Sequence, residues 1–192
     1  RRFDVVAVGS LVEKKGHDVL IKASAELQRR RPHRGAIAGG GRLRSELQRL
    51  IDETGAPVTL LGEVAPHEIH GLLRGASVSA LACVRTPDGD EDGVPVALME
   101  AMQLGVPVVS TNVAGVTELL DDGAAGALVE PGDPVQLAGA LEHALTDPVW
   151  RERASQAGRT RIGVHFDNTI ETRRLIDLLS ATALERTRRS AA

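Results

Sequence analysis

"FDVVAVGSLVEKKGHDVLIKASAELQRR" (residues 3–30) contains an apolar run, a short loop and an amphipathic segment in that order. Residues 3–8 are typical of a buried strand because they are almost continuously apolar. Over residues 14–30 the apolar side chains recur at helical spacing, and Gly9 allows a tight turn between the two segments. The stretch therefore predicts a β-loop-α unit, from which parallel sheets are built.

The same alternation continues along the chain. Strand-like apolar runs follow at residues 34–40, 57–62, 77–84, 106–111 and 126–132. Helical patterns are found at residues 42–55, 66–76, 95–105, 115–123 and 133–148, the last with Asp133 as its N-cap. Six strands that alternate with helices predict an α/β fold with a Rossmann-like, doubly wound parallel sheet. In such sheets ligands bind beyond the carboxyl ends of the strands, so the loops after the strands are the places to search for a site.

The domain organisation follows from where this alternation stops. After residue 148 the chain becomes helical and charged, and residues 171–189 predict a long amphipathic helix. We expect one Rossmann-like domain over residues 1–160 and a helical tail over residues 161–192.

Composition excludes several classes of function. The net charge is −3 and the pI is about 6.1, so the chain offers no basic field for nucleic acid. Aromatic residues make up only 2% of the sequence, which leaves few platforms for stacking bases. The single cysteine, Cys83, excludes an internal disulfide and reads as a core residue. No apolar run approaches the roughly 20 residues of a membrane-spanning helix.

An acidic loop, "DGDEDG" (88–93), matches the start of a calcium-binding loop. That motif needs a glutamate at its twelfth position, which is Met99 here, and Glu100 misses the position by one residue. We therefore expect no metal site. Three of the acids read as a solvated turn: Asp88, Asp90 and Glu91.

The helix that follows the acidic loop has no evident cap. Pro95 suits the first helical position, which places Val94 at the N-cap, where a valine offers nothing to the free amides of Val96 and Ala97. A bound phosphate would satisfy those amides, and the helix dipole favours it. The alternative is that Asp92 folds forward and caps the helix.

Other candidate residues each have a plain structural alternative. Glu100 lies more than a turn into the same helix, either at the rim of a site, where ribose hydroxyls would be suitable donors, or on the exposed face. Lys14 and Lys15 place positive charge near a helix N-terminus, either to hold a diphosphate or to point into water. His17 flanks Gly16 and is a weaker candidate. "HEIH" (67–70) lacks the spacing of a zinc-binding motif.

Several stretches together resemble a known family, the C-terminal domain of retaining GT-B glycosyltransferases of the group 1, or family 4, type. The similarity covers roughly residues 3–180 and favours bacterial exopolysaccharide and colanic-acid type members. The stretches that carry it, in chain order, are "VGSLVEKKGHDVLIKA", "IAGGGRLRSELQRLI", "VTLLGEV" and "DGVPVALMEAMQLGVPVVSTNVAGVTELL".

The resemblance implies roles for individual residues. The family's paired glutamates, with seven residues between them, fall on Asp92 and Glu100, which implies that Asp92 reaches hydroxyls of a donor sugar and Glu100 the ribose. The backbone from Gly93 to Ala97 should face the sugar and diphosphate. Lys15 matches a family lysine on the diphosphate, and Lys15, Asp92 and Glu100 are thereby the implied catalytic residues.

Further positions should bind the donor. The family arginine on the diphosphate is replaced by Ser10, next to Gly9, and Lys14 is a candidate to compensate. The backbone near Glu63 and Val64 should flank the base, and the glycines around Gly40 should line the same crevice.

The implied function is retaining transfer of a sugar from a nucleotide-diphosphate sugar in bacterial polysaccharide synthesis, without a cofactor. A UDP-sugar is favoured over a GDP-sugar. The chain is expected to be the donor-binding half of a GT-B fold, inactive without an N-terminal domain that binds a glycan or lipid-linked acceptor. The expected location is cytoplasmic, with a peripheral position at the inner face of the plasma membrane left open. Two alternatives are a nucleotide-sugar-binding module with lost catalysis and another GT-B chemistry, sugar-nucleotide epimerisation or phosphorolysis.

Overall fold

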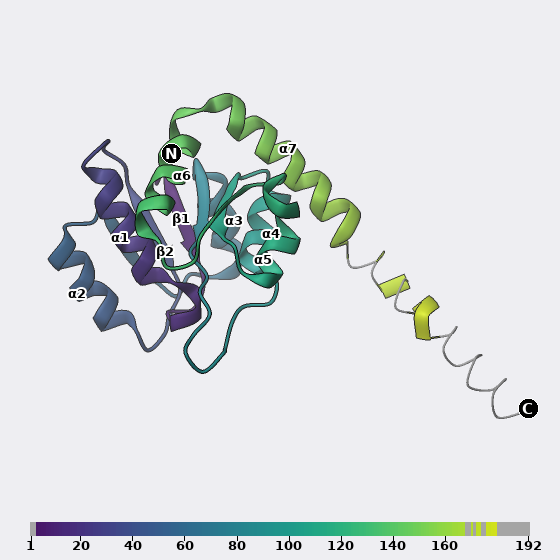
Figure 1. Ribbon diagram of the computed structural model, residues 1–192, viewed down its shortest axis with the longest axis horizontal. Helices are drawn as coiled ribbons and strands as arrows, with labels where there is room; N and C mark the ends of the chain where they lie inside the picture. Colours follow the sequence, from purple (N-terminus) through teal and green to yellow (C-terminus); the bar gives the residue numbers. More distant parts are fainter. Residues whose placement is uncertain (1–2, 168–169, 171, 174–175, 180–192) are drawn as a thin grey trace, which may run out of the picture.

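A six-stranded parallel sheet forms the centre of the computed structural model, which describes residues 3–167, 170, 172–173 and 176–179 (Figure 1). The strands are β1 (Val5–Val8), β2 (Gly35–Ala38), β3 (Val58–Gly62), β4 (Val78–Leu81), β5 (Val108–Thr111) and β6 (Ala127–Val129). Their order in the sheet is β3-β2-β1-β4-β5-β6, with every neighbouring pair parallel. This confirms the predicted Rossmann-like, doubly wound fold.

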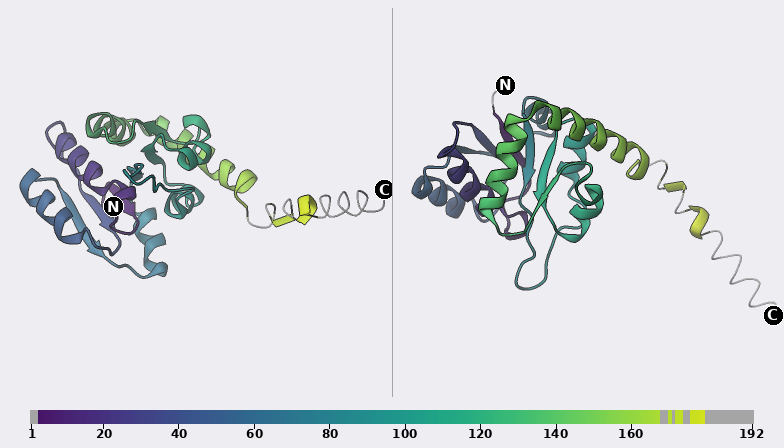
Figure 2. Two further views of the ribbon diagram at one scale, coloured as in Figure 1. Left: turned by 60° about the horizontal axis from the view of Figure 1, so that its bottom comes forward. Right: turned by 45° about the horizontal axis from the view of Figure 1, so that its top comes forward.

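Helices cover both faces of the sheet (Figures 1 and 2). One face carries α1 (His17–Gln28), α2 (Arg44–Thr54) and α6 (Pro134–Thr146). The other carries α3 (Pro66–Arg74), α4 (Val96–Gln103), α5 (Ala114–Leu119) and α7 (Pro148–His165). Each layer buries Leu, Val, Ile and Ala against the strands, which explains why the strands are apolar on both sides. On the first face α6 also packs against α1, and Arg30 pairs with Glu142 at 3.2 Å.

The first helix starts later than the sequence pattern predicts. A short 3₁₀ turn, Glu13–Lys15, ends at Gly16, whose φ is +59°, and α1 begins only at His17. The backbone of Gly16 passes so close to β4 that a Cβ there would lie 1.8 Å from the carbonyl oxygen of Ala82. Lys14 and Lys15 therefore lie in a separate turn and not in the first turn of α1.

The predicted helix over residues 115–123 is also shorter than expected. Its α-helical part, α5, ends at Leu119, and a 3₁₀ turn follows at Asp121–Gly123. Asp121 and Asp122 adopt left-handed conformations, with φ of 52° and 51°, which interrupts the helix. Arg161 of α7 donates to Asp121 at 3.2 Å and holds this turn against the domain.

The last two helices have aspartate caps. Asp133 accepts bonds from the amides of Val135 and Gln136, which confirms the predicted N-cap of α6. Asp147 caps α7 in the same way. Residue 160, the expected domain boundary, lies inside α7, and packing against the domain continues to the buried Ile162.

Two expectations concern the chain beyond α7 and the membrane. The predicted helix over residues 171–189 lies largely outside the described residues, so it stays a prediction. Within the part of the chain that the structure describes, no helix is both long and apolar enough to cross a membrane.

Candidate functional site

The loops that follow the strands meet at one edge of the sheet because all six strands are parallel. Backbone hydrogen bonds lock these loops together. The amide of Leu11 donates to the carbonyl of Gly40 at 2.8 Å, and the amide of Val84 donates to the carbonyl of Lys14 at 2.9 Å. The first loop, residues 9–16, is thereby fixed to the loops after β2 and β4.

A cavity of about 910 Å³ opens at this edge. It lies where the chain order reverses, since β1 has β2 on one side and β4 on the other. It is lined by Val8, Gly9, Ser10, Ala38, Gly39, Glu63, Val64, Pro66, His67, Ile69, His70 and Glu100. Backbone, apolar side chains and a few carboxylate and imidazole groups suit a polar ligand with an apolar part.

The structure brings several of the predicted site residues together in this cavity: Gly9, Ser10, Glu63, Val64 and Glu100. Gly40 is close by, because a Cβ there would lie 2.6 Å from the carboxylate of Glu63. Sequence reasoning missed the contribution of α3, from which His67 and His70 reach the cavity. Their position just after the end of β3 was the available signal, but they were judged only against a zinc-binding spacing.

Lys15 and Asp92 form an ion pair beside the cavity, with Nζ 2.7 Å from Oδ2. Only 16% of the lysine side chain and 11% of the aspartate side chain are exposed. The thiol of Cys83 donates to the same carboxylate oxygen at 3.4 Å. Burial, followed by the charge of Asp92, raises the pKa of the Cys83 thiol to about 12, so the group stays a neutral donor.

The N-terminus of α4 has no side-chain cap. The alternative in which Asp92 caps the helix is thereby excluded, and the carboxylate turns to Lys15 instead. The helix starts at Val96, one residue later than predicted, because Pro95 has an extended ψ of 115° and is itself the N-cap. The backbone from Gly93 to Ala97 is not part of the cavity lining.

The acids of the loop after β4 do not converge on one point. Asp88 accepts from Thr86, Asp90 pairs with Lys14 at 3.0 Å, and Asp92 pairs with Lys15. Among the described residues no group of three or more acidic, histidine or cysteine side chains is arranged to hold a metal ion. Lys14 lies at a separate, smaller cavity of about 540 Å³ that Ser10 also lines.

His17 supports the backbone of the first loop from inside the domain. Its side chain is only 1% exposed, and Nε2 lies 3.2 Å from the carbonyl oxygen of Ser10. Burial lowers the pKa of this imidazole to about 4, so the ring is neutral at neutral pH and donates from Nε2. His17 is therefore a structural support of the first loop and does not line the cavity.

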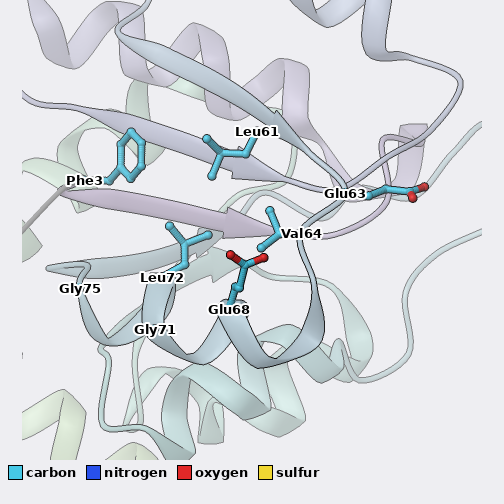
Figure 3. A pocket seen from close by; sticks show the side chains of 8 residues that line it. All are labelled: Phe3, Leu61, Glu63, Val64, Glu68, Gly71, Leu72 and Gly75. Carbon is cyan, nitrogen blue, oxygen red and sulfur yellow. The ribbon is translucent and has the colours of Figure 1, made fainter.

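A second cavity, of about 450 Å³, adjoins the first at Glu63 and Val64. Figure 3 shows Phe3, Leu61 and Leu72 directed into the space between the sheet and α3, while the Glu63 carboxylate points away from it. This cavity extends away from the strand ends, and Glu68 of α3 also lines it.

The chain belongs to the glycosyl transferases group 1 family, whose model matches residues 1–161. Among curated relatives, a Salmonella typhimurium protein named for a glycosyltransferase role in colanic acid biosynthesis is 34% identical over 181 residues, 92% of this chain and 45% of the relative. A GDP-mannose-dependent monoacylated α-(1-6)-phosphatidylinositol monomannoside mannosyltransferase of Corynebacterium glutamicum is 33% identical over 92% of this chain and 47% of its own length. The chain thus spans about half the length of these relatives.

Solved structures share the fold. HepE of Anabaena, crystallised in complex with UDP-glucose, has a TM-score of 0.81 at 24% identity over 94% of this chain and 49% of its own. The C-terminal domain of the group 1 family protein LpcC from Francisella tularensis has a TM-score of 0.73 at 20% identity, covering 86% of this chain and 87% of that chain. At these identities the likeness shows the fold, which is that of one domain of a GT-B glycosyltransferase.

Proposed function

We propose that this chain is the donor-binding half of a retaining, family 4 type glycosyltransferase. It would bind a nucleotide-diphosphate sugar, whose sugar is transferred to a glycan or lipid-linked acceptor held by a further domain. The observation that carries the proposal is the 910 Å³ cavity at the reversal of strand order, with Glu100 and the loop after β1 in its lining. Membership of the group 1 family supports it.

The residues around the cavity suit the parts of such a donor. The half-buried Glu100 carboxylate can accept from both ribose hydroxyls, and Glu63 and Val64 lie where the base would stack. Just outside the cavity lining, the Lys15 ammonium can neutralise charge on a diphosphate, and the uncapped amides at the start of α4 can donate hydrogen bonds to its oxygens. They would stabilise the diphosphate as it leaves, while a donor phosphate oxygen takes the proton of the acceptor hydroxyl.

For the base of the donor, we place UDP ahead of GDP. HepE, the structural relative, was crystallised with UDP-glucose, whereas the Corynebacterium relative is GDP-mannose-dependent. The name of the latter protein includes a phosphatidylinositol monomannoside, which supports a lipid-linked acceptor for the whole protein. We also propose that the whole protein works in the cytoplasm, at the inner face of the membrane.

Calorimetric titration of the chain with UDP, GDP and ADP in parallel, first without metal and then with Mg²⁺, tests this function. We expect one nucleotide to bind, and Glu100→Gln to weaken it about tenfold or more, because a charge-assisted bond to the ribose is lost. Glu46→Gln, at an exposed position of α2, is the control and should leave the affinity unchanged. If no nucleotide binds, or if both glutamine variants bind equally well, the proposed function is wrong.

Ser10→Arg is expected to tighten nucleoside-diphosphate binding. Ser10 is exposed and lines the cavity at the position where the family carries an arginine, so the new guanidinium can reach a diphosphate in two parallel bonds. We expect a gain of about tenfold for the nucleoside diphosphate and little change for the nucleoside without phosphates. Unchanged affinity for the diphosphate in the same titration would contradict the placement of the phosphates beside this loop.

A further inference from the structure

The ion pair between Lys15 and Asp92 is the most enclosed contact between oppositely charged side chains that the described residues show. Both side chains are mostly buried, and Oδ2 of Asp92 accepts from the ammonium of Lys15 and from the Cys83 thiol. A charge in such a place is costly without its partner, so each group holds the other in position.

The position of Lys15 links the pair to the cavity. Its aliphatic stem lies against Gly9, since a Cβ on Gly9 would meet Cδ of Lys15 at 3.5 Å. Gly9 lines the cavity, whereas neither Lys15 nor Asp92 does. A ligand in the cavity therefore meets the loop that carries Lys15 before it meets Asp92.

We propose that Asp92 acts through Lys15, as the internal counter-ion that holds the ammonium beside Gly9 until a donor diphosphate takes it over. This rests on the proposed function and gives Asp92 the part of a positioning residue, in place of the direct contact with sugar hydroxyls that the family resemblance implies. The aspartate side chain is short, and one of its oxygens is already committed to Lys15 and Cys83.

A counter-ion role and a direct contact with the sugar predict different effects of removing the Asp92 charge. A diphosphate competes with the Asp92 carboxylate for the same ammonium, so Asp92→Asn should tighten binding of the nucleoside diphosphate. The sugar nucleotide should gain by the same factor, because the sugar does not touch residue 92. A direct contact with the sugar predicts instead that only the sugar nucleotide weakens.

The experiment is calorimetric titration with UDP and UDP-glucose, or with GDP and GDP-mannose if the wild-type chain prefers guanine. We expect Asp92→Asn to bind both ligands about tenfold more tightly, and the same substitution in a Lys15→Met background to change neither affinity. Asp90→Asn is the matched control, because Asp90 pairs with Lys14 at 3.0 Å but is 56% exposed and screened by solvent. It should shift the affinities less than about twofold.

Other results of the titration would overturn either the role of Asp92 or the proposed function. Weaker binding of the sugar nucleotide alone, or an effect that persists without Lys15, would overturn the inference while leaving the proposed function intact. Unchanged or equally weakened binding of both ligands would overturn it as well. Failure of the wild-type chain to bind any nucleotide would instead reject the proposed function. If Asp92→Asn does not fold, as judged by thermal unfolding, the smaller neutral variant Asp92→Ser gives the same comparison.

Discussion

Gly39→Ala is expected to destabilise the domain by about 3 kcal/mol or more and to abolish ligand binding in the large cavity. Gly39 has a φ of +155°, and a Cβ there would lie 1.9 Å from the carbonyl oxygen of Gly9 and 2.7 Å from its carbon. Both atoms belong to backbone that cannot move freely, because the Gly9 amide donates to Ala38 at 3.0 Å. The loop after β1 must therefore shift, and the cavity lining shifts with it.

The neighbouring glycine provides a matched control. In Gly40→Ala the new Cβ would meet the side chain of Glu63, which is exposed and can turn away. We expect this variant to lose no more than about 1 kcal/mol. Denaturant unfolding of both variants, followed by titration with the nucleotide that wild type binds, makes the comparison. Equal stability of the two variants would show that the close approach of Gly39 to Gly9 is not rigid.

Acid should weaken the fold through His17. Its pKa is about 4 in the folded state because the ring is buried, against 6.5 for an ordinary histidine. A lowered folded pKa means that the unfolded chain binds a proton first as the pH falls below 6.5. The neutral ring thus contributes stability fully above that pH, and the contribution declines towards pH 4. The loss amounts to about 3 kcal/mol over this window.

The free energy of unfolding, measured by denaturant titration from pH 7.5 to 4, tests this expectation. His17→Gln keeps a donor for the Ser10 carbonyl but cannot titrate. Its free energy of unfolding should therefore fall by about 3 kcal/mol less than that of wild type across the window. Burial also lowers the pKa of His33, which makes stability fall with acid in wild type and in His17→Gln alike. His67→Gln, at an exposed ring, should follow the wild-type curve, and parallel curves for wild type and His17→Gln would contradict the argument.

The sheet was predictable because its signal is local. Each strand is a short apolar run, and the alternation with helices indicates a parallel arrangement. The edge of the sheet that carries the cavity could therefore be predicted without knowledge of any contact. The roles of two lining residues came instead from the family resemblance: Glu63 follows a strand, and the position of Glu100 in the helix after the acidic loop also fitted an exposed face.

What could not be predicted depends on contacts between distant segments. The break of the first helix at Gly16 is required by the carbonyl of Ala82, which directly follows the strand β4. The ion pair of Lys15 with Asp92 joins two loops, and its distance depends on how β1 and β4 are paired. Helical spacing also predicted Pro95 as the first residue of α4. The spacing does not reveal the extended ψ that makes Pro95 the N-cap instead.

The packing of α6 on α1 has a consequence for how the chain folds as it is synthesised. Strands β1 to β3 form one contiguous half of the sheet, yet one face of this half is covered partly by a helix that is made much later, Pro134–Thr146. Until that helix leaves the ribosome, the apolar side chains of α1 that it covers stay open to water or to other chains. The early half is then exposed to non-native association, and the delay makes a chaperone most useful between the synthesis of α1 and that of α6.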